Sequence, residues 1–265
     1  MTTDRPKRVL IIAGSDSSGG AGIQADIKTV TMLGGYAMTA ITAVTAQNTR
    51  GVSAVETLSP DMVAAQIDAC MADIGVDAVK IGMLGSADIA EIVADRLEDL
   101  DRPIVFDPVM VATSGSVLAD EATIEVFGWL MELASVTTPN IPELEALTGL
   151  NLSIDGAIAE AAAQLAEKHG CAILAKGGHG AGDKVTDRLV KPDGSFASFG
   201  DPRIDTKHTH GTGCTLSSAL ATYLAQGLPM EDAVRQARAF VRSALLAAPG
   251  FGSGHGPMGH QAVRR

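Results

Sequence analysis

Short apolar runs alternate with helix-forming segments along almost the whole chain. The first run, "VLIIA" at residues 9–13, is rich in β-branched residues and stops at a glycine, which is typical of a buried strand. Such alternation predicts an α/β fold with a mostly parallel central sheet and helices on both faces. No linker or internal repeat interrupts it, so we expect a single domain over residues 1–265. The expected strand segments are 9–13, 37–48, 52–58, 78–84, 103–109, 135–140 and 171–178, with a hairpin over 185–200.

Capping residues indicate where several helices begin. Ser59 followed by Pro60 predicts a helix over 61–74, because serine is a good N-cap and proline fits the first helical turn. Ser86 predicts a helix that runs to Leu100, and Ser153 predicts one that ends at His169. The remaining helices are expected after the glycine loop 14–20 and over 120–132, 142–148, 212–226 and 230–247.

Composition limits the partners and the compartment. Hydrophobic residues make up 46% of the chain and aromatic residues only 3%, so small aliphatic residues must fill the core. A net charge of −11 argues against nucleic acid or an anionic membrane as a partner, but not against an anionic substrate. Cys70, Cys171 and Cys214 are too few and too widely spaced for a disulfide framework or structural zinc site. The first apolar run is too short for a signal peptide, and we expect a cytoplasmic protein.

The unusual residues follow the expected strands. The segments "GSDSSGG", "AQN", "IGML", "DPV", "TPN" and "KGGH" each come at the carboxyl end of a strand. In open α/β sheets this edge is where ligands bind. Each segment alone is an ordinary turn signal, but together they predict one binding site along this rim.

The stretch "HGTGCT" places Cys214 where a helix is expected to begin. Unpaired N–H groups at a helix start, with glycines that allow close approach, favour an anion. The same position predicts a thiol pKa below the ordinary value. The alternative is that Cys214 is only a small residue that packs the helix start.

Three further motifs do not indicate a nucleotide or metal site. Gly254, Gly256 and Gly259 fit GxGxxG, but no strand precedes them and no long helix follows. "GGHGAGDK" resembles a phosphate-binding loop, but its lysine is one residue late and no Ser/Thr follows. His208 and His210 have no carboxylate or cysteine cluster that would complete a metal site, so we expect them not to be ligands.

Four strand-end residues have the chemistry that phosphoryl transfer requires. Asp107, Asn140 and Glu143 are oxygen ligands suited to Mg²⁺, directly or through water, and Lys176 is a cation. Phosphoryl transfer needs positioning, charge neutralisation and a base for the acceptor. Together with Cys214, these residues supply the parts that phosphoryl transfer needs.

The motifs "AGSDSSGGAGIQADIKT", "TAQNTRGV", "KIGML", "TPNIPE", "KGGH" and "HTHGTGCT" occur here in an order that resembles the hydroxymethylpyrimidine/phosphomethylpyrimidine kinases of thiamine biosynthesis. The resemblance covers nearly the whole chain, and cysteine in "GTGC" is its most discriminating part. It implies a ribokinase-like fold and two successive ATP-dependent phosphorylations, of 4-amino-5-hydroxymethyl-2-methylpyrimidine to the monophosphate and then to the diphosphate. It also implies a homodimer.

The resemblance also implies roles for individual residues on the acceptor side. Cys214 is the base or proton relay, and the backbone amides of Gly211, Thr212, Gly213 and Cys214 form the anion hole. The pyrimidine pocket is implied to contain Gln47, Gly14, Asp26 and Met83. The alternatives are that Gln47 caps a strand end, that Asp26 is a helix-surface carboxylate and that Met83 fills the core.

The remaining implied roles lie on the phosphate side. Lys176, Asn140, Glu143 and Thr209 are expected near ATP and its phosphates, and Asp107 with Glu143 near Mg²⁺. The alternative for Asp107 is that "DPVM" simply ends a strand.

Three other functions stay open at this point. A pyridoxal-type kinase of the same fold, or a kinase that accepts both rings, fits the same motifs. A cysteine hydrolase would use His208 or His210 as base, but no third orienting group is evident. A pyrimidine sensor would keep Gln47 without needing the phosphate-side residues.

Overall fold

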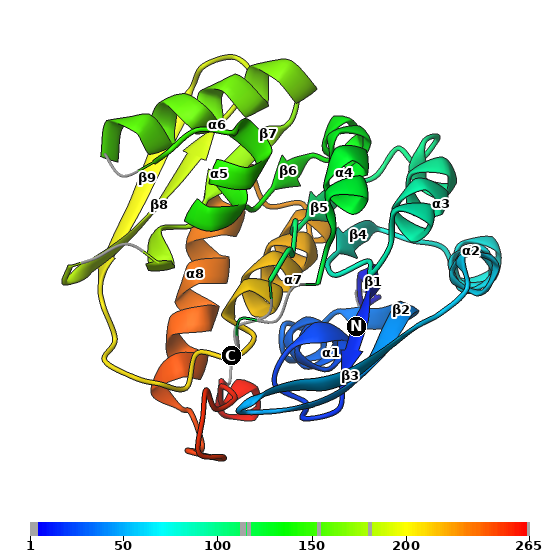
Figure 1. The fold of residues 1–265 in the computed structure, drawn as a ribbon, viewed down its shortest axis with the longest axis horizontal. Helices are drawn as coiled ribbons and strands as arrows, with labels where there is room; N and C mark the ends of the chain where they lie inside the picture. Colours follow the sequence, from blue (N-terminus) through cyan, green and yellow to red (C-terminus); the bar gives the residue numbers. More distant parts are fainter. Residues whose placement is uncertain (1–4, 112–114, 116–117, 153–154, 180–181, 264–265) are drawn as a thin grey trace.

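The structure, a computed structural model, describes residues 5–111, 115, 118–152, 155–179 and 182–263. Within these ranges the strands form one nine-stranded sheet of order β3-β2-β1-β4-β5-β6-β7-β8-β9 (Figure 1). The six neighbouring strands β2, β1, β4, β5, β6 and β7 are parallel; β3 and β8 run antiparallel to them, and β9 pairs antiparallel with β8. The strands are β1 (Arg8–Asp16), β2 (Tyr36–Asn48), β3 (Gly51–Thr57), β4 (Ala78–Ile81), β5 (Ile104–Phe106), β6 (Val136–Thr137), β7 (Ala172–Ala175), β8 (Lys184–Val190) and β9 (Phe196–Pro202).

Helices cover both faces of this sheet, which confirms the predicted architecture. One face carries α2 to α6, and the other carries α1, α7 and α8 (Figure 1). The α-helices are α1 (Gly22–Met32), α2 (Pro60–Ala69), α3 (Ala87–Leu97), α4 (Glu121–Leu133), α5 (Ile141–Thr148), α6 (Asp155–His169), α7 (Thr212–Ala225) and α8 (Met230–Leu246). No helix in the described ranges is both long and apolar enough to span a bilayer.

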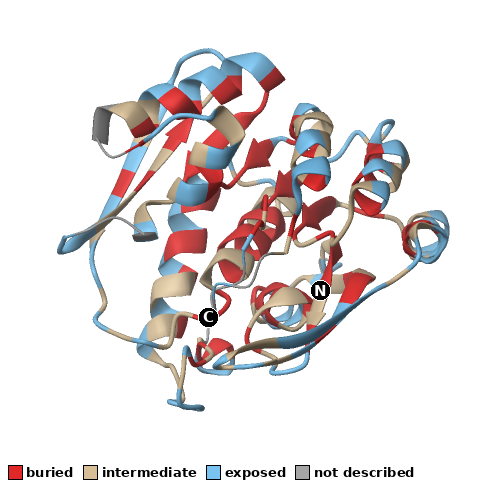
Figure 2. Ribbon diagram, viewed as in Figure 1, coloured by how far each residue is buried: buried red, intermediate tan, exposed pale blue. Residues whose placement is uncertain are grey.

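The central strands are buried because both their faces are covered. Alternate residues of β1 enter different cores: Leu10 and Ile12 face α2 to α6, whereas Val9 and Ile11 face α1, α7 and α8. Figure 2 shows β4 to β7 as buried, whereas the edge strand β3 is mostly exposed. This double burial explains why the sequence pattern of the central strands is continuously apolar.

The predicted caps are largely confirmed. The Ser59 and Ser86 side chains accept hydrogen bonds from the backbone N–H groups three residues later. The helix predicted over 61–74 is interrupted: α2 ends at Ala69, and Cys70–Ile74 forms a wider π-turn that stops at Gly75, whose φ is 78°. Ser153 lies outside the described residues. All three cysteines are free thiols, as expected.

Candidate active site

Helix α7 begins with an open first turn. Its N-cap is Gly211, with φ of 84°, and no side chain caps it. A Cβ on Gly211 would overlap the carbonyl oxygen of Gly20, so only glycine fits at this contact between two loops. The first-turn N–H groups of Gly213 and Cys214 have no intrahelical acceptor and are available to an anion, whereas the Thr212 N–H donates to the Thr209 carbonyl at 3.3 Å. The structure thus brings together the residues expected to form the anion hole.

The Cys214 thiol is half-buried and neutral, which corrects the expectation of an acidic thiol. Burial, together with the nearby carboxylates of Asp26 and Asp107, raises its pKa to about 11. Lys80 and the backbone N–H of Gly22 act in the opposite direction but do not outweigh burial. The helix start alone therefore does not decide the charge of this thiol. The carboxylates of Asp26 and Asp107, which are far from Cys214 in the sequence, contribute as well.

Asp26 and Lys80 form a fully buried ion pair beneath α7. Lys80 Nζ lies 2.9 Å from Asp26 Oδ2, and Ser218 Oγ donates to Asp26 Oδ1 at 2.7 Å. Burial alone would lower the pKa of Lys80, but the Asp26 carboxylate outweighs it and raises that pKa. Asp26 is thus neither a helix-surface carboxylate nor exposed to a substrate in this structure, because Lys80 and Ser218 occupy it. We therefore revise its role from direct contact to support of the helix that carries Cys214.

Lys80 is a residue that the sequence analysis missed. It lies in β4, between apolar residues of a central strand, and is fully buried. Lysine in such a strand is rarely buried without a partner, and this is the signal that could have found it.

A second pair, Asp107 with Lys176, lies at the ends of β5 and β7. Lys176 Nζ donates to Asp107 Oδ1 at 2.7 Å, and Thr138 Oγ1 donates to the same oxygen at 3.0 Å. Burial would raise the pKa of Asp107, but Lys176 and Lys80 outweigh it and lower the pKa. A Cβ built on Gly213 would lie 3.4 Å from Asp107 Oδ2 and 3.5 Å from Lys176 Nζ. The open turn of α7 therefore lies directly against this pair.

Asn140 and Glu143 form a reciprocal cap at the start of α5. Asn140 Oδ1 accepts from the Glu143 N–H at 2.9 Å, and Glu143 Oε2 accepts from the Asn140 N–H at 2.7 Å. Glu143 Oε2 also lies 3.7 Å from Lys176 Nζ. Burial raises the pKa of Glu143 to about 7, with Lys176 opposing and Asp107 adding to the rise. The cap explains why the amide oxygen of Asn140 is already engaged.

The carboxylates Asp107 and Glu143 fit a magnesium ion only in company with other ligands. Within the described ranges no group of three or more His, Cys, Asp or Glu side chains could hold a metal. Lys176 already contacts both carboxylates. Mg²⁺ characteristically takes one or two carboxylates and completes its shell with phosphate oxygens and water, and these two residues match that pattern.

On the acceptor side, three of the predicted pocket residues lie at neighbouring strand ends. A Cβ on Gly14 would lie 3.1 Å from Met83 Sδ, so the glycine leaves space for the thioether. Met83 is half-buried, and its carbonyl accepts from Thr42 Oγ1 at 2.7 Å. Gln47 is also half-buried, near the end of β2, and its side chain lies between Thr45 and His210. These positions leave part of Met83 and Gln47 accessible to a ligand.

Asp16 and His210 join the two loops of the site, and the sequence analysis did not recognise this pair. His210 Nε2 lies 2.8 Å from Asp16 Oδ2, and both residues are buried. Asp16 also accepts from the backbone N–H groups of Ser18, Gly20 and Ala21. The signal was the combination of an aspartate in a glycine-serine loop with a histidine beside "GTGC". Among the described contacts, His210 is bonded to Asp16 and not to Cys214, which argues against a cysteine–histidine hydrolase.

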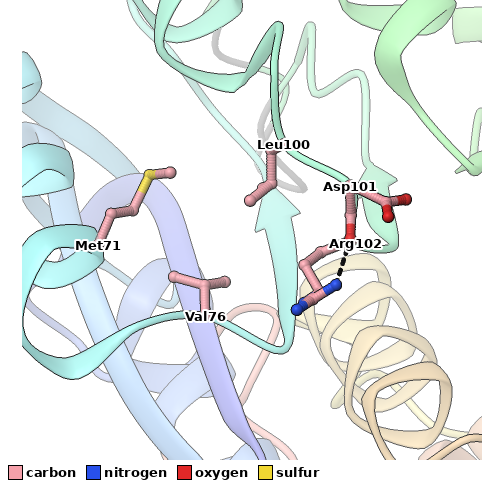
Figure 3. Close-up of a pocket in the computed structure, with 5 residues that line it drawn as sticks. All are labelled: Met71, Val76, Leu100, Asp101 and Arg102. Carbon is pink, nitrogen blue, oxygen red and sulfur yellow. Dashed lines mark hydrogen bonds between the residues drawn. The ribbon is translucent and has the colours of Figure 1, made fainter.

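A separate pocket lies at the amino ends of the central strands, opposite the rim that carries the site. It measures about 230 Å³ and is lined by Met71, Val76, Leu100, Asp101 and Arg102 (Figure 3). Met71 lies in the π-turn Cys70–Ile74, and the other four residues lie in the connections that lead into β4 and β5. They therefore lie at the amino ends of the strands, away from the carboxyl-end rim that carries Cys214 and Lys176.

Comparison with known proteins shows which family the chain belongs to. Residues 16–259 match the family model described as phosphomethylpyrimidine kinase. The thiamine biosynthesis bifunctional protein ThiED of Geobacter sulfurreducens is 50% identical over 95% of this chain, which spans only 52% of that protein. A hydroxymethylpyrimidine/phosphomethylpyrimidine kinase of Haemophilus influenzae is 44% identical over 98% of both chains.

The fold also matches solved structures. An ADP complex of Bacillus subtilis pyridoxal kinase superposes with a TM-score of 0.89 at 33% identity, over 97% of this chain and 98% of that one. The ribokinase-like fold is therefore confirmed. With the match to the family model over most of its length, the chain belongs to the phosphomethylpyrimidine kinase family.

Proposed function

We propose that the chain transfers the γ-phosphoryl group of ATP to 4-amino-5-hydroxymethyl-2-methylpyrimidine and then to the resulting monophosphate. One observation carries this proposal: the uncapped start of α7, with Cys214 in its first turn, lies against the Asp107–Lys176 pair. Phosphoryl transfer depends on positioning and on stabilising charge, and this arrangement supplies both. The names of the Geobacter and Haemophilus relatives support the thiamine pathway.

In the proposed reaction the phosphate side neutralises charge. Lys176 Nζ and the first-turn N–H groups of Gly213 and Cys214 hold the oxygens of the phosphoryl group during its transfer. Thr209 lies in the loop before α7, where its carbonyl accepts from the Thr212 N–H at 3.3 Å and supports this turn. Bound Mg²⁺ would neutralise phosphate charge beside Asp107 and Glu143.

On the acceptor side, the substrate hydroxyl must lose its proton as its oxygen bonds to phosphorus and the bond from the γ-phosphorus to ADP breaks. Cys214 is the proposed proton relay. A thiol with a pKa of about 11 is neutral at pH 7 and does not act as a preformed thiolate. It would take the proton of the substrate hydroxyl while giving its own proton to an oxygen of the transferred phosphoryl group, so that the thiol is regenerated, and Lys80 would stabilise the negative charge on the sulfur during this exchange.

The direct test is product analysis with ATP, Mg²⁺ and the pyrimidine alcohol. We expect the monophosphate first and the diphosphate later, each formed with one ADP. A reaction that stops at the monophosphate under excess ATP would contradict the second step. If no ADP forms, the proposed function is wrong.

Replacing the proposed relay tests its role. Cys214→Ala is expected to lower turnover by about 10²–10⁴-fold while ATP and the pyrimidine still bind. Turnover and calorimetric affinities of the same preparation provide the measurement. Cys171→Ala is the matched control, because Cys171 is a buried thiol in the core. Near-normal turnover of Cys214→Ala would leave Cys214 as a packing residue.

Pyridoxal-type phosphorylation is the second candidate. The close superposition on the Bacillus pyridoxal kinase supports it, since the two chains share one fold over nearly their whole lengths. The higher identity to the Haemophilus relative favours the pyrimidine. Comparing kcat/KM for the pyrimidine alcohol and for pyridoxine decides between one ring, the other, or both.

The same family membership supports four subsidiary proposals: ATP·Mg²⁺ as the donor, a homodimer, location in the cytoplasm, and one domain as the folding unit. Metal removal, sedimentation equilibrium, cell fractionation and the coincidence of urea-unfolding transitions followed by different probes test them respectively.

A further inference from the structure

The C-terminal tail, residues 248–263, returns from the end of α8 to the rim that carries Cys214. Figure 1 shows the tail in red beside the tip of the β2–β3 hairpin, where its backbone bonds to Thr49. It contains the three glycines that share the GxGxxG spacing, Gly254, Gly256 and Gly259. Its end is buried, with the His260 side chain only 1% exposed. A tail that buries its end beside the rim can act on the residues there.

Each of the three glycines lies against a different segment and has no room for a side chain. A Cβ on Gly254 would overlap the carbonyl oxygen of Thr49, in the turn between β2 and β3. A Cβ on Gly256 would overlap the His208 ring, and one on Gly259 would overlap the backbone at the end of α8. The glycines therefore let the tail backbone approach three segments closely, which explains their presence without a bound nucleotide.

The tail bonds to both sides of the turn that carries Cys214. On the upstream side, the His210 N–H donates to the Gly256 carbonyl at 3.2 Å. On the downstream side, Thr215 Oγ1 lies 2.8 Å from His260 Nε2. His210 directly precedes the N-cap of α7, and Thr215 directly follows Cys214. The two contacts therefore bracket the first turn of this helix.

The contact between Thr215 and His260 is sealed from water, since the two residues are 0% and 1% exposed. Burial lowers the pKa of His260 to about 4, and Lys28 adds to the fall, so the ring is neutral at pH 7. A hydroxyl can donate or accept, so the pair is compatible with either tautomer of the neutral ring. Thr222, in the same helix, donates instead to the carbonyl four residues earlier. The Thr215 hydroxyl thus ties α7 to the tail.

We propose that the C-terminal tail is a positioning element for the first turn of α7, and that His260 is its positioning residue, acting through Thr215. The turn must hold its N–H groups and the Cys214 thiol in one place while charge develops on the transferred group. A misplacement of about 1 Å can cost about 10²-fold in rate. The catalytic consequence rests on the proposed function, whereas the restraint of the turn does not.

The restraint is measured without substrate, as the rate at which iodoacetamide modifies each cysteine, located by mass spectrometry. Cys214 reports on the turn, Cys70 on a half-buried site away from the rim, and Cys171 on the core. In His260→Leu we expect Cys214 to react about two- to tenfold faster, because the loss of one hydrogen bond lets the turn open more often. Cys70 should react at its ordinary rate, and Cys171 should stay unreactive.

Two further substitutions separate this restraint from general effects of changing the tail. His255→Leu, at an exposed histidine of the same tail, is the matched control and should leave the Cys214 rate unchanged. Gly256→Ala acts on the other side of the turn, since its Cβ forces the tail backbone away from His208 and from the His210 N–H. We expect it to raise the Cys214 rate as well.

Three outcomes would overturn the proposal. The first is a Cys214 rate in His260→Leu that equals the rate in the unsubstituted protein, and the second is an equal rise in His255→Leu. If Cys171 also reacts in His260→Leu, that variant has lost its fold and Gly256→Ala decides. Reaction of Cys171 in both variants, the third outcome, would make the tail a folding element only.

Steady-state kinetics test the catalytic consequence. His260→Leu is expected to lower kcat about tenfold with little change in either KM, as for an interaction that matters only in the transition state. His260→Gln, whose amide can still pair with Thr215, should recover most of the turnover. Equal losses in the two variants, or a rise in both KM values, would leave His260 with a structural role only. If the unsubstituted protein forms no ADP, the proposed function fails, while the thiol rates still test the restraint.

Discussion

Two aspartate–lysine pairs lie below the start of α7, and they differ in how far they are exposed. In the Asp26–Lys80 pair both side chains are 0% exposed, and the Nζ–Oδ2 distance is 2.9 Å. In the Asp107–Lys176 pair the lysine side chain is 13% exposed, and its Nζ also lies 3.7 Å from Glu143. The first pair is sealed in the core and the second opens onto the rim.

This difference in exposure separates a pair that supports the fold from a pair that can contact a ligand. A sealed pair cannot exchange partners with a ligand, so Asp26–Lys80 can act only by fixing α7 through Ser218 and by its field at Cys214. An open lysine that serves two carboxylates can turn toward a phosphate without leaving either of them isolated. The same residue types thus take different roles because of burial.

Breaking the sealed pair should give the largest effect. Lys80→Met leaves the Asp26 charge buried with Ser218 alone, and we expect the free energy of unfolding to fall by about 3–5 kcal/mol. Urea unfolding measures it. The double variant Lys80→Met with Asp26→Leu should recover most of the loss, because no charge is then left unpaired. Lys191→Met, at an exposed pair with Glu231, is the control and should change little. A small loss in Lys80→Met would show that Asp26 is neutral in the fold.

Breaking the open pair should mainly affect catalysis. Lys176→Met removes a cation expected to contact phosphate, so we expect kcat to fall by about 10²–10³-fold. The loss of unfolding free energy should be smaller than in Lys80→Met, because Thr138 still donates to Asp107. Steady-state kinetics and urea unfolding of both variants measure the two effects. Equal destabilisation by the two substitutions, with turnover of Lys176→Met intact, would make the pairs equivalent and refute the distinction.

Much of the fold could be predicted because the pattern is local. Buried parallel strands must be apolar on both faces, and caps such as Ser59 and Ser86 are within three residues of the N–H groups they serve. The wide turn at Cys70–Ile74 was missed because it differs from an α-helix only in backbone hydrogen bonding.

The site was predicted less completely, for a physical reason. Sequence placed the strand-end residues on one rim, but pairings such as Asp26 with Lys80 and Asp16 with His210 join residues 54 and 194 positions apart. The pKa of Cys214 was predicted in the wrong direction because burial and two distant carboxylates outweigh the helix start. Which charge neighbours which is a property of the tertiary structure.

The smallest expected effect is the pH dependence of stability that comes from Glu143, the second carboxylate beside Lys176. Burial raises the pKa of Glu143 from about 4.5 to about 7, with Asp107 adding to the rise. The folded state therefore binds a proton more tightly than the unfolded state does. The resulting stability is fully present below the unfolded pKa of about 4.5 and is lost as the pH rises through about 7.

Between about pH 5 and about pH 8, we expect this group to lower the free energy of unfolding by about 2 kcal/mol. Urea unfolding at the two pH values measures the loss, and Glu143→Gln should abolish it, because the amide does not titrate and its oxygen can still accept from the Asn140 N–H. Asp26→Asn is a poor control, since it breaks the sealed pair. Glu145→Gln, at a half-buried carboxylate two residues along α5 that accepts from the Leu152 N–H, should keep the full pH dependence. A loss that persists in Glu143→Gln would assign the titration to another group and would leave Lys176 shared between two ionised carboxylates at neutral pH.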